Sequence, residues 1–503
     1  MAGIKSLVKD TAIYGVSSIF GRFLNWALNF LYLNVFADAA YGDQSFLYSI
    51  TAVLLMVLTY GMETGFFRYA NKEGHDPDSV YSTSLISVGT TSLVFIALLA
   101  VFLNPIAVLL KQSKAPEFVL LLGITVAIDA FSNIPFAYLR YKNMPVRFAT
   151  IKLLNIGFTI ALNLFFLLWC PVIARGSAAW LVNWFYLPLG GASFTIGWVF
   201  VANLMATGLV FLCLTPYFVG KIRSFDFSLL RSMLSYSWPI LVLGIAGSIS
   251  HSMGQIMIPY LFEGQDEAAK AMVGVYNAGW KIAVVLVMFS QAFRYAYEPF
   301  IFSQSKNKGE EKLRVYSEAM KYYVIFGFFI FLGVMYFLPV MKHLIKSDFW
   351  DGLKVVPVVM AAEIFSGIFF NLSIWYKLTD RTRWGMYFSL ICFAVMFGLN
   401  LWFVPAIGIP GGYMGSAWAA VIGYFVVMVL SYLVGRRYYP VPYPLLKLGK
   451  YASIAVLLYV VGEWMYFYDA MWLTYLSRVV LLGGYCAAVY FGEFASTKGI
   501  RLA

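Results

Sequence analysis

Long apolar runs that recur along nearly the whole chain restrict its fold more than any other feature. Of 503 residues, 61% are hydrophobic and 12% are charged, against about 45–50% and about 25% in an ordinary soluble domain. A helix needs about 20 mainly apolar residues to cross the roughly 30 Å hydrocarbon core of a bilayer, because each residue adds 1.5 Å. The sequence therefore predicts an all-α polytopic membrane protein.

Charged residues, prolines and glycines divide these runs into fourteen expected membrane-spanning helices. In chain order they cover 11–36, 44–70, 79–110, 117–141, 145–170, 193–216, 232–262, 272–300, 317–341, 352–377, 383–405, 411–435, 446–468 and 471–494. The first run is too long and too polar for a signal peptide, which indicates an uncleaved span. The longest connection, 171–192, contains Trp180, Trp184 and Tyr186 and is expected to be an interfacial aromatic segment.

Lysine and arginine are distributed unequally between the two sides of the expected helices. Assigning the loops to alternate sides puts 25 basic residues on one side and 7 on the other. Because cytoplasmic loops carry the excess of basic residues, both termini are expected in the cytoplasm. The same rule accounts for the net charge of +12, and no basic stripe or arm indicates nucleic-acid binding.

A repeated tetrapeptide indicates two halves. Phe-Arg-Tyr-Ala ends the second expected helix at 67–70 and the eighth at 293–296, an offset of six helices. Two six-helix halves in the same orientation would produce this spacing. The expected organisation is an N-terminal lobe over 1–216, a cytoplasmic linker over 217–231, a C-terminal lobe over 232–437, and two further helices with the tail over 438–503.

Polar side chains form stripes on several expected helices. The residues expected to line a central cavity are Ser18, Arg22, Asn25, Asn29, His251, Gln255, Asn277 and Lys281. Helical spacing puts the first four on one face. Neutral polar residues also hold transmembrane helices together through interhelical hydrogen bonds, and this packing role remains open for each of them.

Two deep cations distinguish these stripes from ordinary helix packing. Arg22 and Lys281 lie far inside spans in opposite halves, where a charged side chain costs about 2.5–3.5 kcal/mol on insertion scales. We expect both to face one aqueous cavity and to bind an anionic group such as a diphosphate. Lys152 and Arg478, nearer to span ends, are expected to extend their charges to the interface.

Intramembrane carboxylates are the candidates for ion coupling. Asp129, Glu363 and Glu63 are each compatible with carrying an ion or with neutralising a nearby cation. Enzyme signatures are missing: the histidines are isolated, and no zinc-protease or phosphate-loop motif is present. The four cysteines form neither a metal motif nor a disulfide framework. We expect no enzyme activity, no metal and no cofactor.

Five segments carry a family resemblance. They are GMETGFFRY at 61–69, AYLRYKN at 137–143 followed by RFA at 147–149, VYNAGWKIA at 275–283, QAFRYAYEPF at 291–300 and LSIWYKLT at 372–379. In these segments the chain resembles bacterial polysaccharide flippases of the multidrug/oligosaccharidyl-lipid/polysaccharide (MOP) exporter superfamily. Gln255 lies where relatives often have an acidic residue followed by a basic one, so ion coupling in that helix is not carried over.

The resemblance implies two lobes around a cationic cavity and transport by alternating access. The expected substrate is a polyprenyl-diphosphate-linked oligosaccharide, moved from the cytoplasmic to the outer leaflet of the inner membrane for O-antigen-type polysaccharide or lipopolysaccharide synthesis. Coupling to H⁺ or Na⁺ and contact with polysaccharide assembly proteins are further expectations, and the last two helices would form a groove for the lipid tail. The rival interpretations are an ion-coupled drug or metabolite antiporter of the same superfamily and a membrane glycosyltransferase.

Overall fold

The computed structural model describes residues 20–72, 74–222, 224–304, 310–379, 381–465 and 471–495, and all regular elements in these ranges are helical. Within them, 13 helices are long and apolar enough to cross a membrane. They correspond to the second to fourteenth expected spans. The first expected span, 11–36, is described only from residue 20, and residues 20–35 are helical. The prediction of an all-α polytopic membrane protein is confirmed.

The chain divides into two compact units, Met1–Gly274 and Val275–Ala503. This division by contacts falls inside one long helix, α13 (Asp266–Gln304), and the linker expected at 217–231 stays a prediction. The seventh span belongs to the first unit by its contacts, because Ser49 on α2 donates a buried hydrogen bond of 2.5 Å to Gln255 on α12. The six-helix lobes inferred from the repeat stay a prediction.

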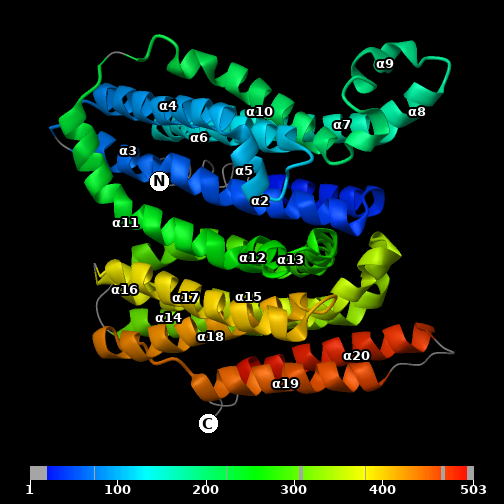
Figure 1. Cartoon of the computed structure of the whole chain (residues 1–503). Coiled ribbons are helices and arrows are strands. Elements are labelled where there is room, and N and C mark those ends of the chain that lie inside the picture. The colour runs from blue at the N-terminus through cyan, green and yellow to red at the C-terminus, as the bar shows by residue number, and fades with distance from the viewer. Residues whose placement is uncertain are drawn as a thin grey trace. The chain divides into compact units, whose positions relative to one another are not determined.

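Residues 20–35 form the first described helix of the first unit. The other helices of this unit precede α13 (Figure 1). They are α2 (Asp38–Thr59), α3 (Met62–Ala70), α4 (Pro77–Val101), α5 (Leu103–Leu109), α6 (Pro116–Tyr141), α7 (Pro145–Leu164), the π-helix η1 (Phe165–Trp169), α8 (Cys170–Arg175), α9 (Trp180–Tyr186), the 3₁₀-helix η2 (Gly191–Phe194), α10 (Gly197–Phe218), α11 (Phe227–His251) and α12 (Met253–Leu261). Helix α6 packs against both α4 and α10, so it lies at the centre of this unit.

Several helix starts follow from local chemistry. Pro77, Pro116 and Pro145 each begin a helix, where proline costs no hydrogen bond because the first amide has no partner within the helix. The Asp76 carboxylate accepts from the amides of the first turn of α4, and Asp226 does the same for α11. Such caps satisfy amides that the helix leaves unpaired.

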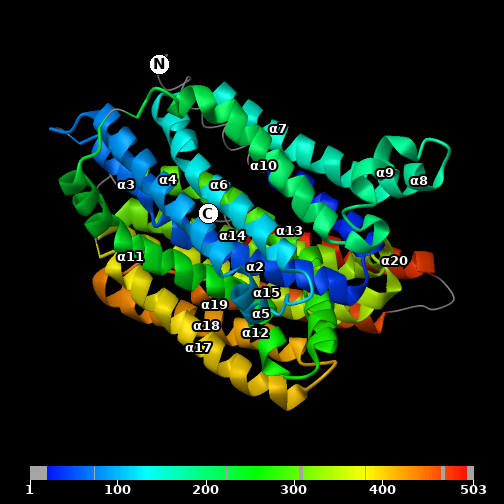
Figure 2. The same ribbon diagram turned by 45° about the horizontal axis from the view of Figure 1, so that its top comes forward.

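The segment 171–192, expected as an interfacial aromatic loop, folds largely into short helices. In Figures 1 and 2, α8 and α9 form a hairpin beyond the end of α7. Trp180 and Trp184 are exposed on α9, whereas Tyr186 is buried and stacks on Trp198 of α10. One face of α9 therefore anchors the hairpin, and the other presents two indoles outward.

The second unit contains the part of α13 from Val275 onward and the helices that follow it. They are α14 (Glu310–Met341), the 3₁₀-helices η3 (Lys342–Leu344) and η4 (Ser347–Val355), α15 (Val356–Leu372), α16 (Ile374–Leu378), α17 (Arg383–Ile407), α18 (Tyr413–Tyr438), α19 (Leu445–Trp464), α20 (Met471–Tyr490) and the π-helix η5 (Phe491–Ala495). Helix α14 contacts α15, α19 and α20.

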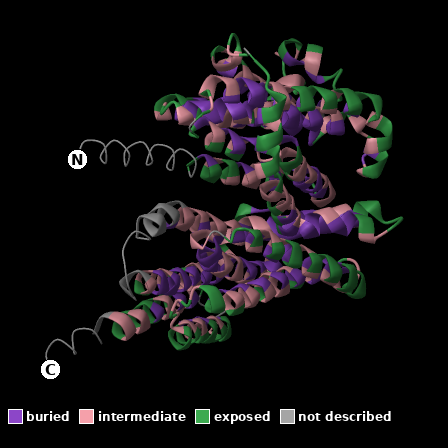
Figure 3. Cartoon of the chain, turned by 90° about the vertical axis from the view of Figure 1, so that its left-hand side faces the viewer, coloured by how far each residue is buried: buried purple, intermediate pink, exposed green. Residues whose placement is uncertain are grey.

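Burial follows the pattern of a protein dissolved in lipid. Figure 3 shows buried residues on helix faces that meet other helices of the same unit, and exposed residues on the outward faces. Large apolar side chains such as Leu93, Val101 and Trp402 are exposed. Because lipid is as apolar as the helix faces, such exposure carries no hydrophobic penalty in a membrane.

Candidate functional site

Arg22 leads the polar stripe on the first helix. Arg22 and Asn25 are exposed, and Asn29 is half-buried and accepts a long hydrogen bond of 3.5 Å from Tyr41 of α2. A different face, with Gly21 and Leu28, packs inside the unit. Ser18 lies outside the described residues. Arg22 and Asn25 thus lie off the packed face of this helix.

The two predicted cavity residues of the seventh span have different surroundings. His251 is exposed at the end of α11. Gln255 is buried, and its side-chain oxygen accepts the hydrogen bond from Ser49. That bond joins α12 to α2, so Gln255 has the helix-packing role that sequence reasoning left open.

Helix α13 carries the second deep cation. Asn277 is buried, whereas Lys281, one turn later, is half-buried with its ammonium 5.7 Å from the ring centroid of Trp280. Arg22 belongs to the first unit and Lys281 to the second. Lys281 therefore lies within a membrane-spanning helix of the second unit, and Arg22 lies on the helix formed by residues 20–35 of the first unit.

The three candidate carboxylates differ in their partners. Asp129 on α6 is half-buried and accepts a 3.3 Å hydrogen bond from Thr207 of α10. Glu63 forms a 2.6 Å ion pair with Arg140. That pair joins α3 to α6, and it identifies neutralisation of a cation as a role of Glu63.

Glu363 is the candidate carboxylate of the second unit. It lies on α15, is 7% exposed, and interacts electrostatically with Arg294 of α13. The guanidinium of Arg294 also stacks on Phe370, 4.0 Å from the ring centroid. In the other copy of the repeated tetrapeptide, Arg68 stacks on Tyr236 at 3.8 Å. The repeated arginines thus share a cation–π contact with a neighbouring helix.

The expectation that Arg478 extends its charge to the interface is wrong, whereas the same expectation for Lys152, which is half-buried, stays a prediction. Arg478 is 1% exposed; it donates to the Tyr336 carbonyl at 2.8 Å and lies 3.3 Å from a Glu463 oxygen. The Lys152 ammonium lies 4.0 Å from the ring centroid of Phe136. The Arg478 guanidinium therefore has polar partners on two adjacent helices, and its charge is paired without reaching the surface.

Sequence reasoning missed a polar cluster at the start of α13. Lys270 forms a 2.9 Å ion pair with Asp43 of α2 and donates to the Lys111 carbonyl, while Gln112 donates to Asp43 at 2.7 Å. Lys111 also pairs with Asp266 at 3.0 Å. These charged residues lie near the ends of expected spans, and this position is the feature of the sequence that could have indicated the cluster. Nothing in the sequence indicated which of them pair.

Comparisons with known proteins agree on one fold. A family model described as "Polysaccharide biosynthesis protein" matches residues 7–304, more than half of the chain. Among solved structures, the lipid II flippase MurJ in an inward closed conformation aligns with a TM-score of 0.69 and 13% identity, covering 95% of this chain and 98% of that one.

A multidrug resistance MATE family transporter of the MOP superfamily, in an inward-facing conformation, aligns with a TM-score of 0.63 and 16% identity, covering 83% of this chain and 94% of that one. A MATE structure in complex with MaD3S aligns with a TM-score of 0.56 and 17% identity, covering 86% and 95%. No curated protein sequence matches the chain. At these identities the structural matches establish the fold.

Proposed function

We propose, because the chain belongs to the polysaccharide biosynthesis protein family, that it is a flippase for a polyprenyl-diphosphate-linked oligosaccharide. The substrate would pass from the cytoplasmic to the outer leaflet of a bacterial inner membrane, for O-antigen-type polysaccharide synthesis, by alternating access. The family description and the fold shared with a lipid II flippase support this proposal. The observation that carries it is Lys281 within the membrane-spanning helix Asp266–Arg294, together with Arg22 in the expected first span.

The diphosphate accounts for both cations. An uncompensated charge within the hydrocarbon is costly, and among the described residues no carboxylate forms an ion pair with Arg22. Guanidinium and ammonium groups form charge-assisted hydrogen bonds with phosphate oxygens. Under the proposal, Arg22 and Lys281 each supply one such contact, and Asn25, Asn29 and Asn277 add neutral donors.

Export assays on charge-removing variants test this assignment. Arg22→Ala and Lys281→Ala should insert normally but stop export, because each loses a contact worth roughly 1.5–3 kcal/mol, about ten- to a hundredfold in binding. Lipid-linked saccharide should then accumulate in the cytoplasmic leaflet. Lys281→Arg should retain more export than Lys281→Ala because it keeps the charge.

The matched control is Lys114→Ala, which removes an exposed cation between two spans and should export normally. If Arg22→Ala or Lys281→Ala exports as well as this control at equal abundance, the diphosphate assignment is wrong. If polyprenyl-linked saccharide is not moved by the purified wild-type protein but a cationic drug is, the antiporter interpretation replaces the flippase. The MATE-like fold is the observation that favours this alternative.

Ion coupling is proposed to run through Asp129 and Glu363, with H⁺ or Na⁺ as the coupling ion. These two carboxylates lie within spans of separate units, whereas Glu63 is held by Arg140. Asp129→Asn and Glu363→Gln should each lower export and flatten its response to an imposed proton or sodium gradient. Unchanged gradient responses in both variants would assign the carboxylates to helix packing.

The proposed orientation puts both termini in the cytoplasm. Reporter fusions within 171–192 and within 305–316 should report opposite sides of the membrane, the former outside and the latter inside, as the unequal distribution of basic residues predicts. Reporters on the same side would contradict this topology without affecting the fold.

A further inference from the structure

A proline-rich strap joins α18 to α19 in the second unit. Over 439–444, Tyr439, Val441 and Tyr443 alternate with prolines. The amides of Val441, Tyr443 and Leu445 each donate to the carbonyl two residues earlier at 2.9 Å, and the Ser317 hydroxyl of α14 donates to the Pro442 carbonyl at 2.7 Å. Prolines restrict the backbone of the strap, and its alternate side chains line one pocket.

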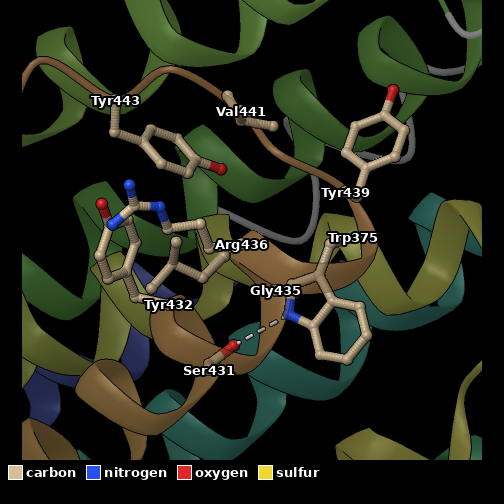
Figure 4. A pocket seen from close by; sticks show the side chains of 9 residues that line it. Trp375, Ser431, Tyr432, Gly435, Arg436, Tyr439, Val441 and Tyr443 are labelled. Carbon is tan, nitrogen blue, oxygen red and sulfur yellow. Dashed lines mark hydrogen bonds between the residues drawn. The ribbon is translucent and has the colours of Figure 1, made fainter.

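The pocket lies between this strap, the last turns of α18, and the junction of α15 and α16 (Figure 4). The Trp375 indole donates to the Ser431 hydroxyl at 3.3 Å. Gly435 admits the indole, since a Cβ there would lie 2.7 Å from a Trp375 ring carbon. The pocket has a volume of about 240 Å³ when the part open to solvent is included. Its wall is therefore largely aromatic.

One cation lines this pocket. Figure 4 shows Arg436 between Tyr432 and Tyr443. In the described part of the chain, no carboxylate pairs with Arg436 and none lines the pocket. Arg381–Lys450 contains six lysines and arginines and no aspartate or glutamate. The pocket thus combines a single fixed positive charge with phenolic hydroxyls, which are neutral hydrogen-bond donors.

The Tyr443 hydroxyl remains protonated. Burial and the neighbouring Tyr439 and Tyr432 raise the pKa of Tyr443 above its ordinary value. Its hydroxyl is therefore a donor at physiological pH and adds no negative charge that would oppose an anion.

We propose that this pocket binds the phosphate diester of an anionic phospholipid, such as phosphatidylglycerol, in the cytoplasmic leaflet. Arg436 would hold the phosphate, with Tyr432 and Tyr443 donating hydrogen bonds to it. A phosphate diester carries one negative charge and matches the single cation, whereas a diphosphate carries more charge than the pocket neutralises. Basic pockets between helices on the cytoplasmic side are suited to lipid headgroups. This site is separate from the proposed transport residues and does not depend on which substrate is carried.

Lipid titrations of the full-length protein in detergent test the site. Native mass spectrometry would measure binding of phosphatidylglycerol, with phosphatidylcholine as the zwitterionic comparison. Arg436→Gln should weaken phosphatidylglycerol binding about ten- to a hundredfold through loss of a charge-assisted contact. Tyr443→Phe should weaken it about two- to tenfold through loss of one neutral hydrogen bond.

Arg437→Gln is the matched control, because it removes the same charge from the adjacent residue, which does not line the pocket. It should bind phosphatidylglycerol nearly as the wild type does. Equal weakening in Arg436→Gln and Arg437→Gln would indicate diffuse attraction and overturn the proposal.

Unchanged binding in both Arg436→Gln and Tyr443→Phe would also overturn it. If Arg436→Gln aggregates, Tyr443→Phe still decides the outcome, since that change preserves the ring. Polyprenyl diphosphate should fail to displace phosphatidylglycerol. If it displaces that lipid in the wild type but not in Arg436→Gln, the pocket takes the transported lipid and the phospholipid assignment is wrong.

Discussion

Gly42→Ala is expected to separate two helices that the structure brings into backbone contact. A Cβ at position 42 of α2 would lie 1.7 Å from the carbonyl oxygen of Lys270 and 3.0 Å from the amide nitrogen of Gly274, both on α13. Non-bonded heavy atoms prefer about 3.5–4.0 Å, so the backbones must move apart by more than about 1 Å. No side-chain rotation can relieve the clash, because both obstructing atoms belong to the backbone.

The expected loss combines two effects. Overpacking of a close contact costs typically about 1–3 kcal/mol, and weakening the adjacent Asp43–Lys270 ion pair, with each side chain 18% exposed, adds up to about 1 kcal/mol. Alanine returns about 1 kcal/mol through its higher helix propensity. The net destabilisation should therefore be about 0–3 kcal/mol, which is about 1–4 kcal/mol relative to a glycine-to-alanine change in a helix that meets no clash.

Thermal unfolding of the detergent-solubilised protein, followed by loss of the monodisperse gel-filtration peak, measures this effect. The matched control is Gly157→Ala on α7, where nothing lies within 4 Å of an added Cβ. That variant should be at least as stable as the wild type. If Gly42→Ala unfolds at the same temperature as Gly157→Ala, the close helix crossing does not contribute as reasoned.

Three further predictions concern the N-terminal part of α14, the start of α11 and the aromatic hairpin. The side chains of Lys321 and Glu493 are 3% and 5% exposed and form an ion pair at 2.5 Å. Lys321→Met should therefore lower the free energy of unfolding by about 2–4 kcal/mol, and the further change Glu493→Gln should recover part of this loss. If the losses of the two changes simply add, the ion pair does not contribute as reasoned. Asp226→Ala should speed hydrogen exchange in the first turn of α11, whereas Asp226→Asn should not. Hydrogen bonds from Leu229 and Ser228 lower the pKa of Asp226 below its ordinary value of 3.8. The Asp226 carboxylate is therefore charged at neutral pH, and its stabilisation of the start of α11 is lost only as the pH falls through this lowered pKa. Lipids brominated near the headgroup should quench less tryptophan fluorescence in the double variant Trp180→Phe, Trp184→Phe than in the wild type. Equal quenching in the two proteins would place these indoles away from the interface.

The sequence alone determined the membrane class and most helix boundaries. Residues 383–405 were expected to be helical and Arg383–Ile407 is, and 411–435 corresponds to Tyr413–Tyr438. These boundaries are local properties, because a span must satisfy its own backbone hydrogen bonds and bury about 20 apolar residues in lipid whatever its neighbours are. The polar stripe of Arg22 follows from helical periodicity for the same reason.

Tertiary structure decided what the polar side chains contact. Arg478 was expected at the interface but is buried on the Tyr336 carbonyl, and Gln255 joins two helices through Ser49. Asp43 and Lys270 are 227 residues apart and form an ion pair. Such contacts depend on which helices are neighbours and on the rotation of each about its axis, and hydropathy specifies neither, because every lipid-compatible helix face has similar energy against lipid and against another apolar face.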